Sequence, residues 1–369
     1  MKNRSFLITL LILLCLLCAV CLTACGEEPD PIPTPVCQHR DADDNSLCDK
    51  CDESYTDGYD EKRSVEKAEI VNGELVVTYT DGTTENLGDL ESLQGQDFSE
   101  EYLKCFEFHV ISNTAFGVKL GDAAYMEDVV IPATYKGIPV TTILSEGFKN
   151  AESIKNLIIP TTVTSIGYSA FSGCSSLTTI TIPDSVTSIG DSAFSYCSNL
   201  TTITIPDSVT SIGNSAFYGC SGLTTVNFGA NSRLTSIGDS AFYGCSSLTS
   251  ITIPAGVTSI GYGAFYGCSS LTTITIPDSV TSIGNSAFRD CSSLTTITIP
   301  ASVTSIGYGA FRDCSSPTSV TFENTEGWWY SSFSDAISGT AISATALSDP
   351  ATAATYLKST YCDYYWHRS

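Results

Sequence analysis

The chain has 369 residues, and 40 acidic side chains against 17 basic ones give it a formal net charge of −23 at pH 7. A phosphate-binding surface needs clustered lysine and arginine, so this balance argues against nucleic acid as a partner. With only three histidines, and neither a G-x-S-x-G nor an H-E-x-x-H motif, the sequence predicts no enzyme and no cofactor for activity.

The N-terminal residues 1–24 have the features of a signal peptide. Lys2 and Arg4 precede an apolar run over residues 6–22, and Leu22-Thr23-Ala24-Cys25 follows. This ending resembles a bacterial lipobox, so we expect Cys25 to be lipidated and to anchor the chain to the membrane. The alternative is an uncleaved signal anchor, because the apolar run approaches the length of a membrane span. Both interpretations predict an exported protein exposed at the bacterial cell surface.

Residues 25–36 hold the lipidated cysteine and a proline-rich stretch, which predicts an extended spacer. The acids are concentrated near it, since residues 26–108 hold 23 of the 40 acidic side chains. We expect the proline-rich spacer to hold the folded part off the membrane, and the acidic segment to be a self-repelling stalk.

Residues 37–64 form a segment rich in cysteine, histidine and aspartate. Four side chains are suited to a structural zinc ion, with two cysteines at the C-x-x-C spacing: Cys37, His39, Cys48 and Cys51. Overlapping residues follow the spacing of a calcium loop: Asp41, Asp43, Asn45, Asp49 and Asp52. That loop lacks its usual glycine, since Ser46 occupies the sixth position. Zinc, calcium, both, or no metal with a disulfide or disorder therefore remain open.

Residues 65–92 predict a small three-stranded β-meander. Asn72-Gly73 and Asp81-Gly82 stand between apolar stretches, and both dipeptides favour the positive φ angles of tight hairpin turns. A unit of this size predicts a spacer role, with self-association through an exposed strand edge as the alternative.

A 23-residue phrase recurs seven times over residues 154–316, with one copy at residues 177–199. A fixed period of this length predicts stacked supersecondary units, each unable to bury its apolar face alone. The expected product is an elongated solenoid that presents surface, and this architecture argues against a pocket enzyme.

Each copy predicts a short strand, a second short extended piece and one helical turn. Thr179 to Ile182 alternate polar and apolar residues, and Pro183 ends the strand. Asp191 stands where a helix cap is expected, before the turn at residues 192–194. The fold class is therefore a β-rich solenoid with one helical turn per coil, preceded by the meander and the cysteine-rich segment.

One cysteine in each copy falls at the same place in the phrase. Side chains stacked in one column lie about 4.8 Å apart, which is wider than the Cβ separation of a disulfide. We therefore expect buried free thiols that act as small apolar residues. The seven are Cys174, Cys197, Cys220, Cys245, Cys268, Cys291 and Cys314.

The pattern L-x-x-I-x-I-P-x-x-V-x-x-I-G-x-x-A-F-x-x-C-x-x resembles the BspA-like (Treponema pallidum type) leucine-rich repeats of bacterial surface proteins. The resemblance is strict over residues 154–316 and looser over residues 129–140, and residues 328–366 look like a C-terminal cap of this family. It implies a leucine-rich repeat solenoid, with an N-terminal cap and degenerate coil at residues 99–153 and a C-terminal cap at residues 317–369. It also implies an adhesin or binding protein without naming the ligand.

Departures from the repeat indicate two candidate ligand surfaces. The residue after the repeated Phe gives an aromatic and then a basic ridge, which we call the Tyr/Arg ridge: Tyr218, Tyr243, Tyr266, Arg289 and Arg312. Threonine ladders on the strands give a second surface, which includes Thr179, Thr181, Thr202 and Thr204. The plainer interpretations are that the tyrosines cover the solenoid and that threonine is a good outward strand residue.

These features predict a non-enzymatic cell-surface protein that binds an extracellular protein or glycan, with adhesion as its expected role. The alternative is a structural or self-associating component of the cell envelope without a host ligand. A third departure is a 25-residue coil, in which residues 226–234 contain two extra residues. Such insertions usually bulge on one side of a solenoid.

Overall fold

The computed structural model describes residues 65–71, 74–79, 84–89, 103, 105–121 and 128–369, which belong to two compact units. The smaller unit contains a three-stranded antiparallel sheet with the strands in chain order: β1 Val65–Val71, β2 Glu74–Tyr79 and β3 Thr84–Asp89. The predicted meander is confirmed, while its two predicted turns lie outside the described residues.

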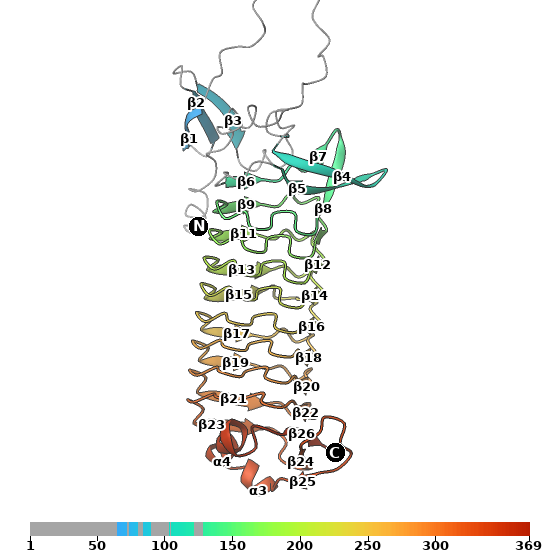
Figure 1. Cartoon of the computed structure of the whole chain (residues 1–369), viewed down its shortest axis with the longest axis vertical. Helices are drawn as coiled ribbons and strands as arrows, with labels where there is room; N and C mark the ends of the chain where they lie inside the picture. The colour runs from blue at the N-terminus through green and yellow to red at the C-terminus, as the bar shows by residue number, and fades with distance from the viewer. Residues whose placement is uncertain (1–64, 72–73, 80–83, 90–102, 104, 122–127) are drawn as a thin grey trace, which may run out of the picture. The chain divides into compact units, whose positions relative to one another are not determined.

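The larger unit is a β-solenoid of about nine coils, each close to 23 residues long (Figure 1). Each coil contributes one short strand to the side that we call the strand face. The described strands of this side are β6 Asp128–Val130, β9 Asn156–Ile158, β11 Thr179–Thr181, β13 Thr202–Ile205, β15 Thr225–Phe228, β17 Ser250–Thr252, β19 Thr273–Thr275, β21 Thr296–Ile299 and β23 Ser319–Phe322. Their parallel pairing joins β6 through β15 in one sheet, and β17 to β19 and β21 to β23 in two more.

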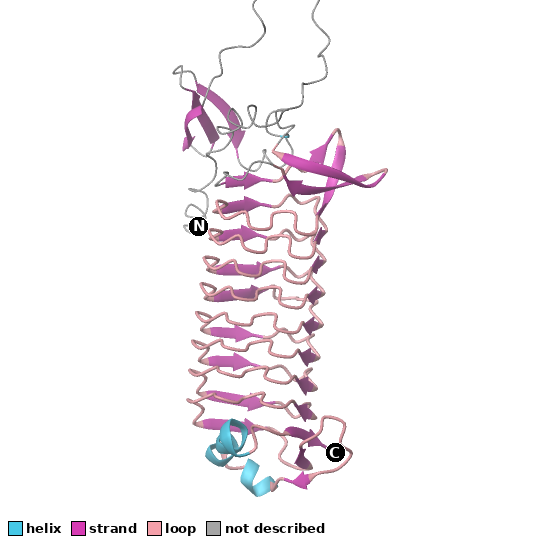
Figure 2. Ribbon diagram, in the orientation of Figure 1, coloured by secondary structure: helices cyan, strands magenta, loops and turns pink. Residues whose placement is uncertain are grey.

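The second strand of each coil belongs to a 14-stranded sheet on another side of the solenoid (Figure 2). These strands are β8 Ile138–Ile143, β10 Ser165–Ile166, β12 Ser188–Ile189, β14 Ser211–Ile212, β16 Ser236–Ile237, β18 Ser259–Ile260, β20 Ser282–Ile283 and β22 Ser305–Ile306. Equivalent residues pair with one another, as Ser211 does with Ser236. The register therefore stacks each apolar position on its own copy in the next coil.

The core consists of these stacked columns. Phenylalanine rings of successive coils lie 5.2–5.4 Å apart between centroids, and they are at most 1% exposed. The column runs through Phe171, Phe194, Phe217, Phe242, Phe265, Phe288 and Phe311. Burying one large apolar side chain contributes about 1.5–3 kcal/mol, so repetition along the stack supplies a continuous core.

The segment expected to form one helical turn is instead a series of reverse turns. The Ala193 N–H donates to the Gly190 carbonyl oxygen of its own coil (3.3 Å), whereas the Phe194 N–H donates to Ala216 of the next coil (2.7 Å). Ser192 has a left-handed backbone with φ 55°. A helix cannot form because alternate N–H groups bond between coils.

The residues expected to cap this turn act between coils as well. The Asp191 Oδ1 accepts a hydrogen bond from the backbone N–H of Asn214 (2.7 Å), and Asn214 repeats the contact to Asp239 (2.8 Å). Asp239 and Asn285 bond in the same way to the next copies, Tyr262 and Tyr308. The predicted helix caps are therefore inter-coil caps, because the chain that they satisfy belongs to the following coil.

Caps cover both ends of the described repeats. At the N-terminal end β4 Phe106–Ser112, β5 Ala115–Leu120 and β7 Thr134–Tyr135 extend the sheet beyond β8. At the C-terminal end the added elements are β24 Trp328–Ser331, β25 Thr340–Ala341, α3 Ala344–Leu347, α4 Pro350–Thr355, a π-helical turn Tyr356–Thr360 (η2) and β26 Tyr365–Arg368.

The C-terminal cap closes the last coil with aromatic side chains. Strand β26 runs antiparallel to β22, and Trp328 and Trp366 are 2% and 1% exposed. Helix α4 begins at Pro350, after Asp349 accepts a hydrogen bond from the Thr352 N–H (2.8 Å). This hydrogen bond caps the first turn of α4, where a proline N–H is not needed.

Candidate functional site

The tyrosines of the Tyr/Arg ridge stack on one another. The Tyr218 and Tyr243 ring centroids are 4.6 Å apart, and those of Tyr243 and Tyr266 are 4.5 Å apart, with the rings within 10° of parallel. The Arg289 guanidinium lies over the Tyr266 ring, 5.5 Å from its centroid. Because these contacts occupy ring faces, the half-buried tyrosines present mainly their edges and hydroxyl groups to solvent.

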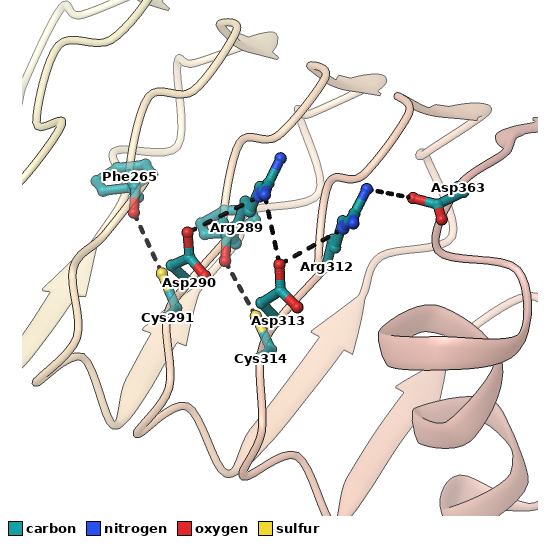
Figure 3. Close-up of polar contacts among 9 residues, drawn as sticks. Phe265, Arg289, Asp290, Cys291, Arg312, Asp313, Cys314 and Asp363 are labelled. Carbon is teal, nitrogen blue, oxygen red and sulfur yellow. Dashed lines mark hydrogen bonds and ion pairs between the residues drawn. The ribbon is translucent and has the colours of Figure 1, made fainter.

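The basic half of the ridge is part of a charge network that reaches the C-terminal cap (Figure 3). Asp313 lies between two arginines, 3.5 Å from Arg289 Nη2 and 3.4 Å from Arg312 Nε. Arg312 Nη1 in turn donates to Asp363 Oδ1 at 3.0 Å. Asp290 also faces Arg289, at 3.8 Å. The two arginines therefore connect the last coils to each other and to the cap.

Sequence reasoning identified the arginines of this network but missed its carboxylates. A signal was present, because the Tyr266-Gly267 pair of one coil becomes Arg289-Asp290 and Arg312-Asp313 in the next two. The paired change of two neighbouring positions indicates compensating charges. The contribution of Asp363 had no such signal, because the cap lies outside the repeat.

Two ridge tyrosines are held in their neutral form. Burial is the main cause that raises the pKa of Tyr218, and the nearby Tyr196 and Tyr243 add to it. The hydrogen bond to Asp290 is the main cause that raises the pKa of Tyr266. The ridge thus offers uncharged phenol hydroxyls beside two arginines that already have carboxylate partners.

The strand face presents exposed, uncharged polar side chains over its central coils. In β11, β13 and β21 the outward threonines are exposed while the alternate isoleucines are buried. Thr179, Thr181, Thr202 and Thr204 all belong to the exposed set. The core needs only the inward residues, so the outward ones are available for contacts with another molecule.

The column of repeat cysteines is confirmed as free and buried. Each thiol donates to the carbonyl oxygen of the column phenylalanine in the preceding coil, at 3.0–3.2 Å. Burial raises the pKa of Cys220 and Cys268 to about 12. A nucleophilic cysteine needs a thiolate and access to substrate, and this column provides neither.

The described histidines belong to the two caps. His109 is exposed, with Nε2 3.6 Å from Glu107, and His367 stacks on Trp329 at 4.4 Å. Over the described residues, no group of three or more His, Cys, Asp and Glu side chains has an arrangement suited to a metal ion. In that same part of the chain, every helix is too short or too polar to cross a membrane.

The predicted lipidation and metal residues lie outside the described residues. They are Cys25, the zinc set Cys37, His39, Cys48 and Cys51, and the calcium set Asp41, Asp43, Asn45, Asp49 and Asp52. They remain predictions from the sequence.

Stacked coils, buried aliphatic and phenylalanine columns and two exposed surfaces define a leucine-rich repeat solenoid. The chain belongs to the family described as BspA type Leucine rich repeat region (6 copies), which matches residues 141–246 and 235–347, together more than half of the chain. No curated protein matches the chain.

Several solved structures are similar to the chain. The T. pallidum Leucine Rich Repeat protein is 25% identical with a TM-score of 0.49, over 60% of this chain and 91% of that one. A leucine rich cell surface protein from Faecalibacterium prausnitzii A2-165 is 31% identical with a TM-score of 0.44, over 65% and 57% of the two chains. A leucine-rich repeat protein from Bacteroides ovatus ATCC 8483 is 24% identical with a TM-score of 0.43, over 62% and 72%.

Proposed function

We propose that the chain is a non-enzymatic binding protein of the bacterial cell surface, which contacts an extracellular protein or glycan through the strand face of its solenoid. The observation that carries this proposal is the exposed, uncharged row of outward threonines and serines on successive strands. A row of uncharged polar groups that repeats from coil to coil suits contact with an extended macromolecule. The signal-like residues 1–24 and the lipobox-like Cys25 support export and anchoring.

The Tyr/Arg ridge is the second candidate surface. Tyrosine and arginine most often carry interface energy, which favours a protein contact there. The stacking of Tyr218, Tyr243 and Tyr266 on one another favours the strand face instead, because those ring faces are already used within the solenoid.

The cap over the last coil argues against end-to-end assembly of copies of the chain. Trp328 and Trp366 are buried there beneath the cap, so the last coil presents no open apolar layer to a second chain. A structural role without a ligand is therefore the weaker alternative.

The proposal is tested by screening the full chain against extracellular matrix proteins, mucins and glycans. A strand-face variant replaces Thr179, Thr181, Thr202 and Thr204 with alanine, and a ridge variant replaces Tyr218, Tyr243 and Tyr266 with phenylalanine. The phenylalanines keep the ring stack and remove only the hydroxyls, so folding is retained.

Binding that the strand-face variant loses and the ridge variant keeps supports the proposal. Loss only in the ridge variant moves the site to the ridge. A folded, monomeric chain that binds none of these molecules contradicts the binding function, and concentration-dependent self-association in sedimentation experiments favours the structural alternative.

A further inference from the structure

The coil that contains the insertion, residues 223–247, is bound to the coil before it. The inserted residues make a wider loop after β15, and the Asn231 N–H donates to Asp207 Oδ1 at 3.1 Å. Arg233 Nε donates to the Asp207 carbonyl oxygen at 3.2 Å, and its Nη2 to that of Ser208 at 3.3 Å. The loop is therefore held toward the N-terminal side of the stack.

On the strand face, the backbone ladder to the following coil is missing. Strands β15 and β17 share no ladder, although each pairs with its other neighbour. In four other coils a serine hydroxyl donates to a carbonyl oxygen of the preceding coil at 2.5–2.7 Å, but Gly256 occupies this place after the insertion. The other described interruption, between β19 and β21, keeps this bond through Ser302 (2.7 Å).

The same two coils remain joined away from the strand face. Ser236 pairs with Ser259 between β16 and β18, and the rings of Phe242 and Phe265 stack at 5.4 Å. The missing ladder is thus confined to the strand face, where a hollow of about 600 Å³ is lined mainly by these two coils. Its volume falls within the range of about 300–1,000 Å³ that is common for small-ligand sites.

The walls of the hollow combine uncharged polar groups with apolar ones. Hydroxyl and amide side chains come from Thr225, Asn227, Asn231, Ser232, Ser250 and Thr252. Apolar surface comes from Phe228, Pro254 and Pro277, which are half-buried. Phe228 is half-buried, whereas the isoleucines at its position in neighbouring coils, such as Ile205 and Ile253, are buried. The lining contains no charged side chain.

We propose that this hollow binds a neutral saccharide and is the specific subsite of the strand face. A sugar has hydroxyl groups that pair with the hydroxyl and amide side chains, and apolar C–H faces that pack against Phe228 and the prolines. An anionic ligand finds no cationic partner in the lining. A wholly apolar ligand leaves the polar side chains unpaired, which costs free energy. The inference rests on the proposed binding function and gives it a ligand class.

The test uses the full chain with neutral oligosaccharides of two to four hexose or N-acetylhexosamine units, and with sialylated and sulfated forms of the same sugars. Isothermal titration calorimetry measures the Kd of the strongest binder. Thr252→Ala and Asn231→Ala alter the hollow, and Thr298→Ala changes the same outward strand position two coils away. Thermal melting verifies that each variant is folded.

We expect neutral sugars to bind more tightly than their acidic forms, with an increase in Kd of at least tenfold for Thr252→Ala and Asn231→Ala and no change for Thr298→Ala. Equal effects of all three variants, or preference for the acidic sugars, overturn the inference. Binding of a matrix protein to the strand face without any sugar binding overturns it and leaves the proposed function standing. A chain that binds neither sugars nor proteins contradicts both.

Discussion

The Arg312 guanidinium donates to the Asp363 carboxylate at 3.0 Å, and this contact ties the last coil to the C-terminal cap. Asp363 is the main cause that raises the pKa of Arg312. Asp313 contributes as well, so the end of the stack is closed by charges in addition to the buried tryptophans.

Replacing Asp363 with asparagine should therefore lower the melting temperature slightly, because the guanidinium loses its nearest charged partner. Salt screens exposed charges, so we expect the difference from wild type to shrink in 1 M NaCl, where the Debye length is about 3 Å. Asp335→Asn, at an exposed carboxylate of the same cap, is the control. Equal melting temperatures for wild type and Asp363→Asn at low salt would show that the contact does not stabilise the cap.

Two glycines that each precede a column cysteine allow the cost of a left-handed backbone to be distinguished from the cost of a steric clash. Gly219 and Gly244 share φ +69°, but a Cβ at Gly219 lies 2.8 Å from the Tyr196 ring, whereas Gly244 has no neighbour closer than 3.8 Å. Gly244→Ala should destabilise the fold by about 1–2 kcal/mol, the usual cost of a left-handed residue with a side chain. Gly219→Ala should cost more, as measured by urea unfolding.

The extra cost at Gly219 should disappear when Tyr196 is shortened to alanine, since the clashing ring is then gone. Gly244→Ala combined with Tyr196→Ala provides the matched control, in which the two effects simply add. An equal cost for both glycine variants in the wild-type background would refute the steric part of the argument.

Alkaline pH should destabilise the solenoid through its cysteine column. Burial raises the pKa of Cys220, Cys268 and Cys314 to about 12, whereas an unfolded thiol titrates near about 8.5. Their stabilising contribution is therefore complete below about pH 8.5 and is lost as the pH rises toward 12. Each such cysteine contributes a slope of up to about 1.4 kcal/mol per pH unit.

Urea unfolding at pH 7, 8, 9 and 10, with reductant present, measures this slope. Cys220→Ala should reduce it because one of the titrating groups is removed. A free energy of unfolding that stays constant up to pH 10 would contradict the buried state of the thiols.

The inter-coil caps predict that removing one of them destabilises the backbone locally. Asn214→Ala leaves the backbone N–H of Asp239 without its acceptor, and we expect a loss of about 1 kcal/mol together with faster hydrogen exchange at that amide. Asn214→Asp keeps an oxygen in the same place, as Asp191 does one coil earlier, and should behave like wild type. Unchanged exchange at Asp239 in the alanine variant would rule out this bond.

The cysteine-rich segment, residues 37–64, predicts that the chain binds a metal ion. We expect one zinc ion per chain by mass spectrometry after dialysis against a weak chelator, with loss of the ion in Cys48→Ser. Asp43→Asn should leave zinc unchanged, and calcium in its place would identify the aspartate set as the ligands. If the chain contains neither metal, the remaining interpretation of the segment is the one without metal, with a disulfide or disorder.

The stacked architecture and its core could be predicted from the repeat alone. A 23-residue period places the same side chain at the same point of every coil, and parallel register brings each copy against its neighbour. For this reason the phenylalanine column and the buried, unpaired cysteines could be predicted, since a residue that contacts its own copy needs no long-range information. The two-residue insertion was also visible, although its consequence was not.

The contacts that neighbouring coils make through their departures from the repeat could not be predicted in this way, because they depend on the folded stack. Asp191 looked like a helix cap because its real partner, the Asn214 N–H, is 23 residues away. The partner of Arg312 lies in a cap outside the repeat, and the ring faces of the ridge tyrosines are occupied because adjacent coils bring them together. The hollow beside Phe228 depends on hydrogen bonds that the insertion makes to one neighbour and fails to make to the other, and a choice between two neighbours exists only once the coils are stacked.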